Sequence, residues 1–314
     1  MTDKGVRVVF MGTSDFAVPT LRALVRTGYD VAGVVCQPDK PVGRGLRVAA
    51  SPIKQTALAL GLPVFQWPSL TRPEAVATLQ ALGADLILVA AFGQYIPQGV
   101  VALPPKGCLN LHPSLLPRHR GASPVAAAIL AGDAETGVTV LLVAAEMDAG
   151  DILAQARTPI GPDETTGSLT TRLATWGAEV FVETVRKWVQ GQIVPRPQDH
   201  SQATWCERLT KEQGWLDWSK SAELLARQIR AYDPWPGTFT RWKGVQLNVL
   251  SATALPDWHG TETLGRVIRV DRGLAVATGN GALRLDAVQL AGRKAVNAVD
   301  FANGARGFVG SVLG

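Results

Sequence analysis

The chain has 314 residues, enough for two domains that each bury a core without disulfide support. Hydrophobic residues make up 46% and charged residues 18%, a composition typical of folded soluble proteins that excludes a disordered chain. The longest apolar runs are far shorter than a membrane span, and no secretory signal is evident, so we expect a cytoplasmic protein.

The net charge of +5 is unevenly distributed. Residues 1–206 hold 17 Lys and Arg against 16 Asp and Glu, whereas residues 207–314 hold 14 against 10. A basic second part indicates a polyanionic partner, although an excess of this size equally suits a domain that is merely soluble.

Cysteine and histidine usage indicates a reducing compartment and no metal. The three cysteines, Cys36, Cys108 and Cys206, are odd in number and far apart, which favours free thiols over a disulfide framework. Neither they nor the four histidines show metal-ligand spacing, so we predict no metal site.

Residues 1–190 alternate between strand-like and helix-like patterns. Strands are expected at 6–11, 31–36, 64–65, 85–90 and 108–111, and helices at 16–25, 51–60, 73–82 and 124–130. A strand pair at 136–143 and 152–158 and a long helix at 165–190 follow. This alternation predicts an α/β domain with a Rossmann-like, mostly parallel sheet and helices on both faces.

Residues 191–206 are polar and rich in proline, which predicts a linker. Beyond it the pattern changes to one helix at 222–232 and five short strands, expected at 238–242, 245–252, 264–270, 274–278 and 282–288, with a last helix at 297–305. Short strands separated by turns predict a small antiparallel barrel over residues 207–314.

Asn110 and His112 stand two residues apart at the end of the predicted strand 108–111. Residues i and i+2 of a strand face the same side, and Pro113 cannot continue a central strand. The pair therefore lies at a strand end, where open α/β sheets bind ligands. An amide that donates to a carbonyl and an imidazole that moves a proton are the equipment for acyl transfer. The alternative is a polar strand end with satisfied hydrogen bonds.

Asp148 follows the predicted strand 136–143 and is the candidate to orient and charge His112, as carboxylates do in triad-like sites. The alternative for Asp148 is a turn aspartate before Gly150. The residues alone do not decide between these roles.

The set Asn110, His112 and Asp148, together with Ser114–Pro117 and Arg120–Gly121, resembles the signature of the folate-dependent formyltransferases. Three further features resemble the members that act on methionyl-tRNA. They are the opening motif Phe10–Ala17, the basic loop Gln37–Gly45, and the second-domain motifs Leu209–Glu212, Leu216–Ser219 and Asp233–Pro236. The similarity covers essentially the whole chain and implies an OB-type barrel for the second domain.

The resemblance implies transfer of a formyl group from 10-formyltetrahydrofolate to the free amino group of methionine on initiator methionyl-tRNA, with no metal. Asn110 and His112 would stabilise the oxyanion and Asp148 would tune His112. The folate-binding residues would be Ser114, Leu115, Leu116 and Pro117, with Leu88, Val89 and Phe92 as the opposite wall. For Arg120 we favour a structural or phosphate-binding role.

The resemblance also implies contacts with tRNA by a monomeric protein. Arg44, with Lys40 and Arg47, would enter the acceptor stem, and Lys211, Arg241 and Lys243 would bind its backbone. Asp15 and Phe16 would line the aminoacyl pocket. Two alternatives remain from the residues: a formyltransferase of small amines, which needs no basic loop, and a catalytically silent RNA-binding module, which needs no Asn110, His112 and Asp148.

Overall fold

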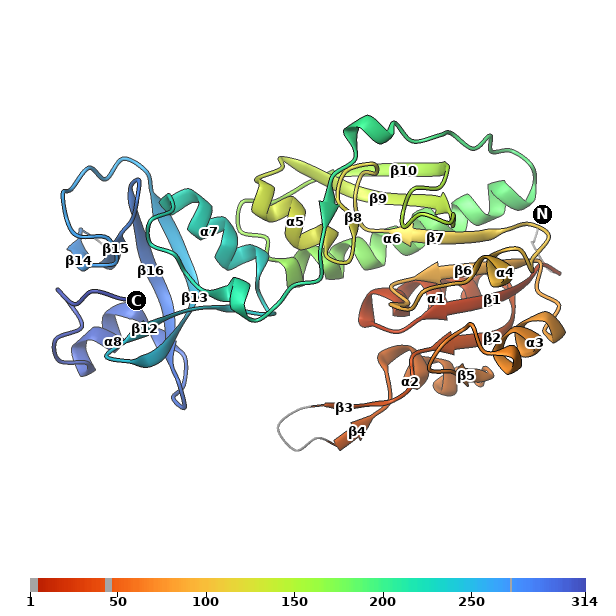
Figure 1. Ribbon diagram of the computed structural model, residues 1–314, viewed down its shortest axis with the longest axis horizontal. Helices are drawn as coiled ribbons and strands as arrows, with labels where there is room; N and C mark the ends of the chain where they lie inside the picture. Colours follow the sequence, from red (N-terminus) through yellow and green to blue (C-terminus); the bar gives the residue numbers. More distant parts are fainter. Residues whose placement is uncertain (1–4, 43–46, 272) are drawn as a thin grey trace. The chain divides into compact units, whose positions relative to one another are not determined.

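The computed structural model describes residues 5–42, 47–271 and 273–314 (Figure 1). The chain forms two compact units. The first comprises the residues up to Pro124, Glu135–Pro159 and Thr170–Cys206, and the second comprises Val125–Ala134, Ile160–Leu169 and Glu207–Gly314. No helix within the described ranges is long and apolar enough to cross a membrane.

The first unit is built on a seven-stranded sheet in the order β10-β9-β7-β6-β1-β2-β5. Its strands are β1 (Arg7–Gly12), β2 (Asp30–Cys36), β5 (Val64–Gln66), β6 (Leu86–Ala90), β7 (Cys108–His112), β9 (Glu135–Leu142) and β10 (Ile152–Pro159). The strands from β7 to β5 are parallel, whereas β9 is antiparallel to both β7 and β10. The predicted mostly parallel sheet is confirmed.

Helices cover both faces of this sheet. They are α1 (Val18–Arg26, preceded by the 3-10 turn Asp15–Ala17), α2 (Pro52–Ala59), α3 (Pro73–Ala81), α4 (Gln98–Val101) and α6 (Thr166–Val189), with α5 (Pro124–Ala131) mostly in the second unit. Helices α3 and α4 pack on the face of Val9, Val89 and Cys108. Helix α6 packs on the other face, where a Cβ on Gly177 would contact Leu111.

This packing fixes which way β7 points its polar residues. Leu111 faces α6, so the alternation of the strand turns Asn110 and His112 to the opposite face, the face of Cys108. The strand ends at His112, as Pro113 predicts. The pair therefore lies at the carboxyl edge of the parallel strands.

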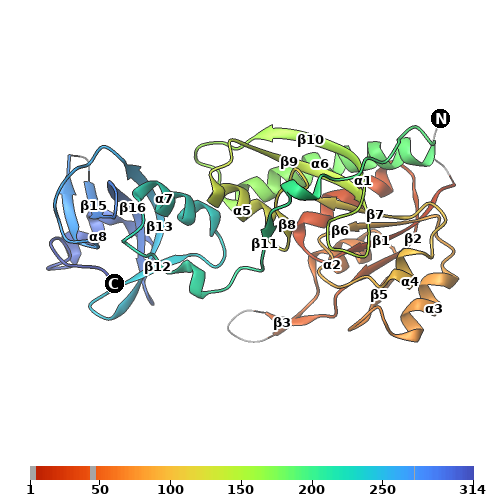
Figure 2. The ribbon, with the colours of Figure 1, turned by 45° about the horizontal axis from the view of Figure 1, so that its top comes forward.

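Two short sheets in the first unit were not predicted. The basic loop after β2 is a hairpin of β3 (Lys40–Val42) and β4 (Arg47–Ala49), which extends from the main sheet (Figures 1 and 2). The hairpin begins beside Asp39, whose carboxylate accepts hydrogen bonds from Lys54 Nζ at 2.6 Å and Gln66 Nε2 at 2.8 Å.

The second short sheet joins β8 (Arg120–Gly121) to β11 (Trp205–Cys206) in parallel register. Residues 191–206 accordingly belong to the first unit by their contacts, and Arg196 also bridges to Ile152. The 3-10 turn His200–Gln202 lies in the same segment.

Residues 207–314 of the second unit form a six-stranded antiparallel sheet together with helices α7 (Ala222–Ala231) and α8 (Ala298–Gly304), in addition to α5 described above. They also contain the 3-10 turn Glu212–Gly214, and the strands are β12 (Thr238–Trp242), β13 (Val245–Leu255), β14 (Val267–Val270), β15 (Gly273–Ala277), β16 (Ala282–Leu290) and β17 (Val296–Asn297). The pairing order is β12-β13-β16-β15-β14, with β17 on β16. The five predicted strands are confirmed, and β17 is an addition.

The core of the second unit includes an aromatic trio. Phe308, fully buried, meets Trp242 and Phe301 edge-to-face, with ring centroids 5.5 and 4.9 Å apart. Such edge-to-face pairs add to the free energy gained by burying the rings.

We predict that Phe308→Ala lowers the free energy of unfolding by ~3–5 kcal/mol, because it removes a buried ring and leaves a cavity. Urea denaturation measures the change, and hydrogen exchange of β12 and β13 amides locates it in the second unit. Val312→Ala, at a side chain that is 50% exposed, is the control and should change stability by less than ~0.5 kcal/mol. Equal effects of the two substitutions would contradict this description of the core.

Candidate active site

Asn110 and His112 occupy the end of β7. His112 is 4% exposed, and Asn110 is half-buried. Within the described residues the Asn110 carboxamide makes no hydrogen bond, so its donors and acceptor are available to a ligand. An imidazole fixed in the protein beside an unoccupied amide is suited to binding a carbonyl oxygen.

Both nitrogens of the His112 ring face protein oxygens. Nε2 lies 2.9 Å from the backbone carbonyl of His119, which adopts a left-handed φ of 57°. A carbonyl only accepts, so Nε2 is the donor in this contact. Nδ1 lies 3.6 Å from Oδ2 of Asp148, within ion-pair range but beyond a hydrogen bond. Nδ1 is therefore the nitrogen left to serve a substrate.

Asp148 is fixed by backbone contacts. Its Oδ2 accepts a hydrogen bond of 2.9 Å from the Gly121 amide, and its own φ is 52°, in the left-handed region. Gly121, with a φ of 111°, is required here because a Cβ would overlap the Cys206 carbonyl. The structure thus places the Asp148 carboxylate beside His112, and its catalytic role stays a prediction.

The segment Ser114–Pro117 after β7 is held by its own protein contacts. The Thr139 hydroxyl donates to the Ser114 carbonyl at 2.7 Å and accepts from the Leu116 amide at 3.1 Å. Gln155 Nε2 donates to the Leu116 carbonyl at 2.7 Å, and the Leu116–Pro117 peptide is cis. Sequence analysis did not identify Thr139 or Gln155, because both lie on strands distant along the chain, β9 and β10.

The structure brings only part of the predicted folate wall to the catalytic face. Val89 pairs in register with Asn110, and Val89 and Phe92 belong to the cluster on that face. Leu88 alternates to the other face and is fully buried. In the loop, Ser114 and Leu116 are buried, and Leu115 and Pro117 are half-buried.

Arg120 is a buried residue whose role the sequence left open. It is 1% exposed, and its guanidinium donates to Gln198 Oε1 from Nη2 at 2.7 Å. This contact ties Arg120 to Gln198 inside the first unit, and its role stays a prediction. Gln198 was not predicted, because nothing in a proline-rich segment marks a glutamine that becomes buried.

The predicted tRNA and aminoacyl residues are spread over both units. Lys40 is exposed and donates to Gln37 Oε1, and Lys211, Arg241 and Lys243 are exposed on the second unit. Arg44 lies outside the described residues. Asp15 is exposed beyond β1, at the same sheet edge as His112, whereas Phe16 is 6% exposed and mostly in the core.

The cysteines show no sign of nucleophilic chemistry. Burial raises the pKa of the Cys108 thiol to about 12, so it remains protonated at neutral pH. Burial also raises the pKa of the Cys206 thiol, with a smaller contribution from the negative charge of Asp148. Among the described residues, no group of three His, Cys, Asp or Glu could hold a metal ion.

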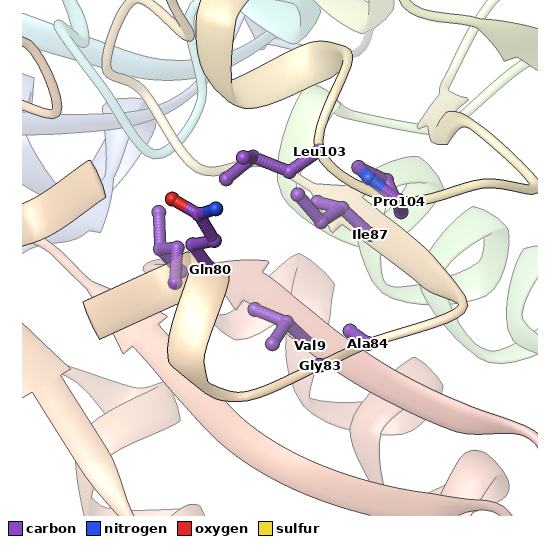
Figure 3. A pocket seen from close by; sticks show the side chains of 8 residues that line it. Val9, Gln80, Gly83, Ala84, Ile87, Leu103 and Pro104 are labelled. Carbon is purple, nitrogen blue, oxygen red and sulfur yellow. The ribbon is translucent and has the colours of Figure 1, made fainter. Parts of the chain in front are cut away.

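A small hollow lies away from this site, between α3, β6 and the loop that follows α4 (Figure 3). Its volume is about 50 Å³, and its lining contains Val9, Ile87, Leu103 and, as a polar side chain, Gln80. Because no ionisable side chain lines it, this hollow has no group that could act as a general acid or base.

Two family matches together cover most of the chain. Residues 6–185 match the family described as Formyl transferase, and residues 208–306 match Formyl transferase, C-terminal domain. The chain therefore belongs to the formyl transferase family. Similar proteins over nearly the full length are named methionyl-tRNA formyltransferase. One from Roseiflexus castenholzii is 48% identical and one from Hydrogenovibrio crunogenus 44%, each covering 98% of this chain and 99% of the relative.

Solved structures share the fold at lower identity. WlaRD, a sugar 3N-formyl transferase crystallised with dTDP and 5-N-formyl-THF, aligns with a TM-score of 0.67 at 15% identity over 92% of this chain and 99% of that chain. HypX from Aquifex aeolicus in complex with tetrahydrofolic acid aligns with a TM-score of 0.62 at 18% identity over 97% of this chain and 48% of that chain. At these identities the likeness supports the fold alone.

We predict that Asp148→Asn lowers kcat for formyl transfer by ~10²-fold or more, because the amide keeps an acceptor for Gly121 but loses the charge facing His112. Steady-state kinetics measures kcat, and thermal unfolding checks that the variant is folded. Met147→Ala, at a neighbouring side chain that is 63% exposed, is the control and should leave kcat unchanged. A fully active, folded Asp148→Asn enzyme would remove Asp148 from the mechanism.

Proposed function

We propose that this protein transfers the formyl group of 10-formyltetrahydrofolate to the α-amino group of methionine on initiator methionyl-tRNA. The observation that carries the proposal is the His112 ring, held between the His119 carbonyl and Asp148 beside the free carboxamide of Asn110. The near-full-length relatives named methionyl-tRNA formyltransferase support the choice of acceptor.

The reaction forms a bond between the amine nitrogen and the formyl carbon and breaks the bond from that carbon to N10 of the folate. In the tetrahedral intermediate the formyl oxygen carries negative charge. Asn110 donates to this oxyanion from its carboxamide, and the His112 ring, in its doubly protonated form, donates from Nδ1 while its Nε2 proton is engaged by the His119 carbonyl. The amine loses one proton, N10 gains one, and tetrahydrofolate leaves.

Asp148 has two roles: it stabilises positive charge on the His112 ring, and it accepts the proton that the attacking amine releases. Its carboxylate faces Nδ1 of His112 at 3.6 Å and stabilises positive charge on the ring while the oxyanion forms. The same carboxylate is the nearest base for the proton released by the attacking amine. No covalent intermediate with the protein is needed, in keeping with the protonated thiol of Cys108.

We assign folate binding to the face that Asn110 shares with Val89 and Phe92, and to the loop from Ser114 to Pro117. The half-buried side chains of Leu115 and Pro117 supply apolar contact for the pterin. The loop's backbone contacts with Thr139 and Gln155 keep it rigid, which reduces the entropy lost on binding.

We assign the acceptor stem of tRNA to the β3–β4 hairpin, with Lys40, Arg44 and Arg47, and the tRNA backbone to Lys211, Arg241 and Lys243. The net charge of +4 on residues 207–314 suits phosphate neutralisation. Asp15 is assigned to the aminoacyl end, with Phe16 as support behind it. Action as a cytoplasmic monomer completes the proposal.

The experiment that tests this function offers the purified protein three acceptors with 10-formyltetrahydrofolate: methionyl-tRNA, a free amino sugar nucleotide and a glycinamide ribonucleotide. The proposal expects formylmethionyl-tRNA and one equivalent of tetrahydrofolate. Formylation of a small amine instead would support the small-amine alternative, and tRNA binding without formylation of any acceptor would support the silent RNA-binding module.

We predict that Asn110→Ala and His112→Ala each lower kcat on methionyl-tRNA by at least ~10²-fold, because each removes a donor to the oxyanion. Binding of a folate analogue, measured by calorimetry, should stay within about fivefold, since these donors act on the transition state. Near-normal turnover by folded His112→Ala protein would refute the assignment.

For the hairpin, we predict that Arg44→Ala slows formylation of methionyl-tRNA by at least ~10-fold while folate-analogue binding changes less than about twofold. Arg26→Ala, at an exposed arginine of α1, is the control for loss of one positive charge and should leave both unchanged. An equal loss of both functions in Arg44→Ala would instead indicate misfolding or a folate role.

A further inference from the structure

Gln198 is a buried hydrogen-bonding centre in a segment that neither family match covers, between residues 185 and 208. Its side chain is 5% exposed. Nε2 donates to the backbone carbonyls of Asp148 and Gly150, each at 2.8 Å. Oε1 accepts from Arg120 Nη2 at 2.7 Å and Nε at 3.2 Å. Both protons of the amide and its oxygen are thus engaged.

Arg120 determines which way the Gln198 amide points. An arginine only donates, so it must face the amide oxygen, and this turns the NH2 group toward the Asp148 loop. Arg120 is itself fixed by His200 Nδ1 at 3.1 Å from Nη2, Glu146 Oε1 at 3.5 Å from Nη1, and the Trp205 ring at 5.6 Å. The orientation of Gln198 is therefore a consequence of a buried, fully charged group.

The two carbonyls that Gln198 holds are those of Asp148 itself and of Gly150, two residues further along the same turn. The left-handed φ of 52° is uncommon for residues other than glycine, so the contacts around Asp148 must hold it. The side-chain carboxylate of Asp148 contacts the Gly121 amide and the His112 ring. Gln198 holds the backbone of the same turn, through the carbonyls of Asp148 and Gly150.

We propose that Gln198 is a positioning residue for catalysis: its two N–H donors hold the Asp148 turn so that the carboxylate stays against His112, and Arg120 sets the amide orientation. The inference rests on the proposed function, since it assigns Gln198 to the same reaction. It places a determinant of the catalytic geometry in the segment predicted to be a linker.

Two substitutions separate the donors of Gln198 from its acceptor. Gln198→Met removes both, whereas Gln198→Glu keeps oxygens for Arg120 but replaces the NH2 group that holds the loop. We expect both to lower kcat by ~10–10²-fold, as a small displacement of a catalytic group does, with KM for the folate substrate within about twofold. Gln202→Met, whose exposed amide bonds among the described residues to Asp199, is the matched control and should keep wild-type kcat.

The alternative outcomes are distinct. Wild-type kcat in Gln198→Glu would show that anchoring Arg120 is sufficient and would overturn the proposal, and so would wild-type kcat in Gln198→Met. An equal loss of folate binding and kcat would assign Gln198 to folding instead, which thermal unfolding of each variant would register.

A measurement on the substrate-free protein tests the role of Gln198 independently of whether the protein formylates methionyl-tRNA. The 15N shift of His112 Nδ1, measured by NMR on histidine-labelled protein, reports the neighbouring carboxylate. In Gln198→Met and Gln198→Glu it should move toward the value of Asp148→Asn, while Gln202→Met matches wild type. An unchanged shift in both Gln198 variants would overturn the positioning role even if wild-type protein formylates methionyl-tRNA. A protein that formylates no acceptor would fail the proposed function while this shift still tests Gln198.

Discussion

The position of one imidazole ring is the constraint on which the site depends. The His112 ring is held at Nε2 by the His119 carbonyl and is faced at Nδ1 by the Asp148 carboxylate. Two residues in left-handed conformations, His119 and Asp148, supply these oxygens, so the geometry exists only because the loops carrying them are tied to the rest of the fold. His112 itself stands at the edge of the sheet, and the loops provide the carbonyl and the carboxylate that face its ring.

The loops are tied by contacts between parts of the chain that are distant in sequence. The Arg120 amide donates to the Thr204 carbonyl at 2.8 Å, and the His119 amide donates to the Thr204 hydroxyl at 2.8 Å. A buried arginine is stabilising only if its donors are satisfied, and Gln198 and His200 do this from the same segment. Gln198, His200 and Thr204 therefore support the catalytic loops from one segment of the chain.

Much of the fold was predictable from the sequence because it depends on local patterns. The apolar run before Asn110 and the proline after His112 marked both the strand and its end, and the spacing placed the two side chains on one face. The pairing of Asp148 with His112 came from a family signature, and the structure brings the two together. Thr139, Gln155 and Gln198 escaped prediction because each contacts backbone groups of residues 23 to 50 positions away in the sequence. A sequence shows a glutamine but not the carbonyls that it meets after folding.

The central claim is that His112 and Asp148 act on the formyl group as one unit. A double-mutant cycle on formylation of methionyl-tRNA tests it most directly, with kcat measured for His112→Ala, Asp148→Ala and the double variant. The account predicts that the double variant is no slower than the slower single variant, within about threefold, because removing either partner already disables the unit. Losses that multiply in the double variant would show that the two residues act independently and would contradict the account.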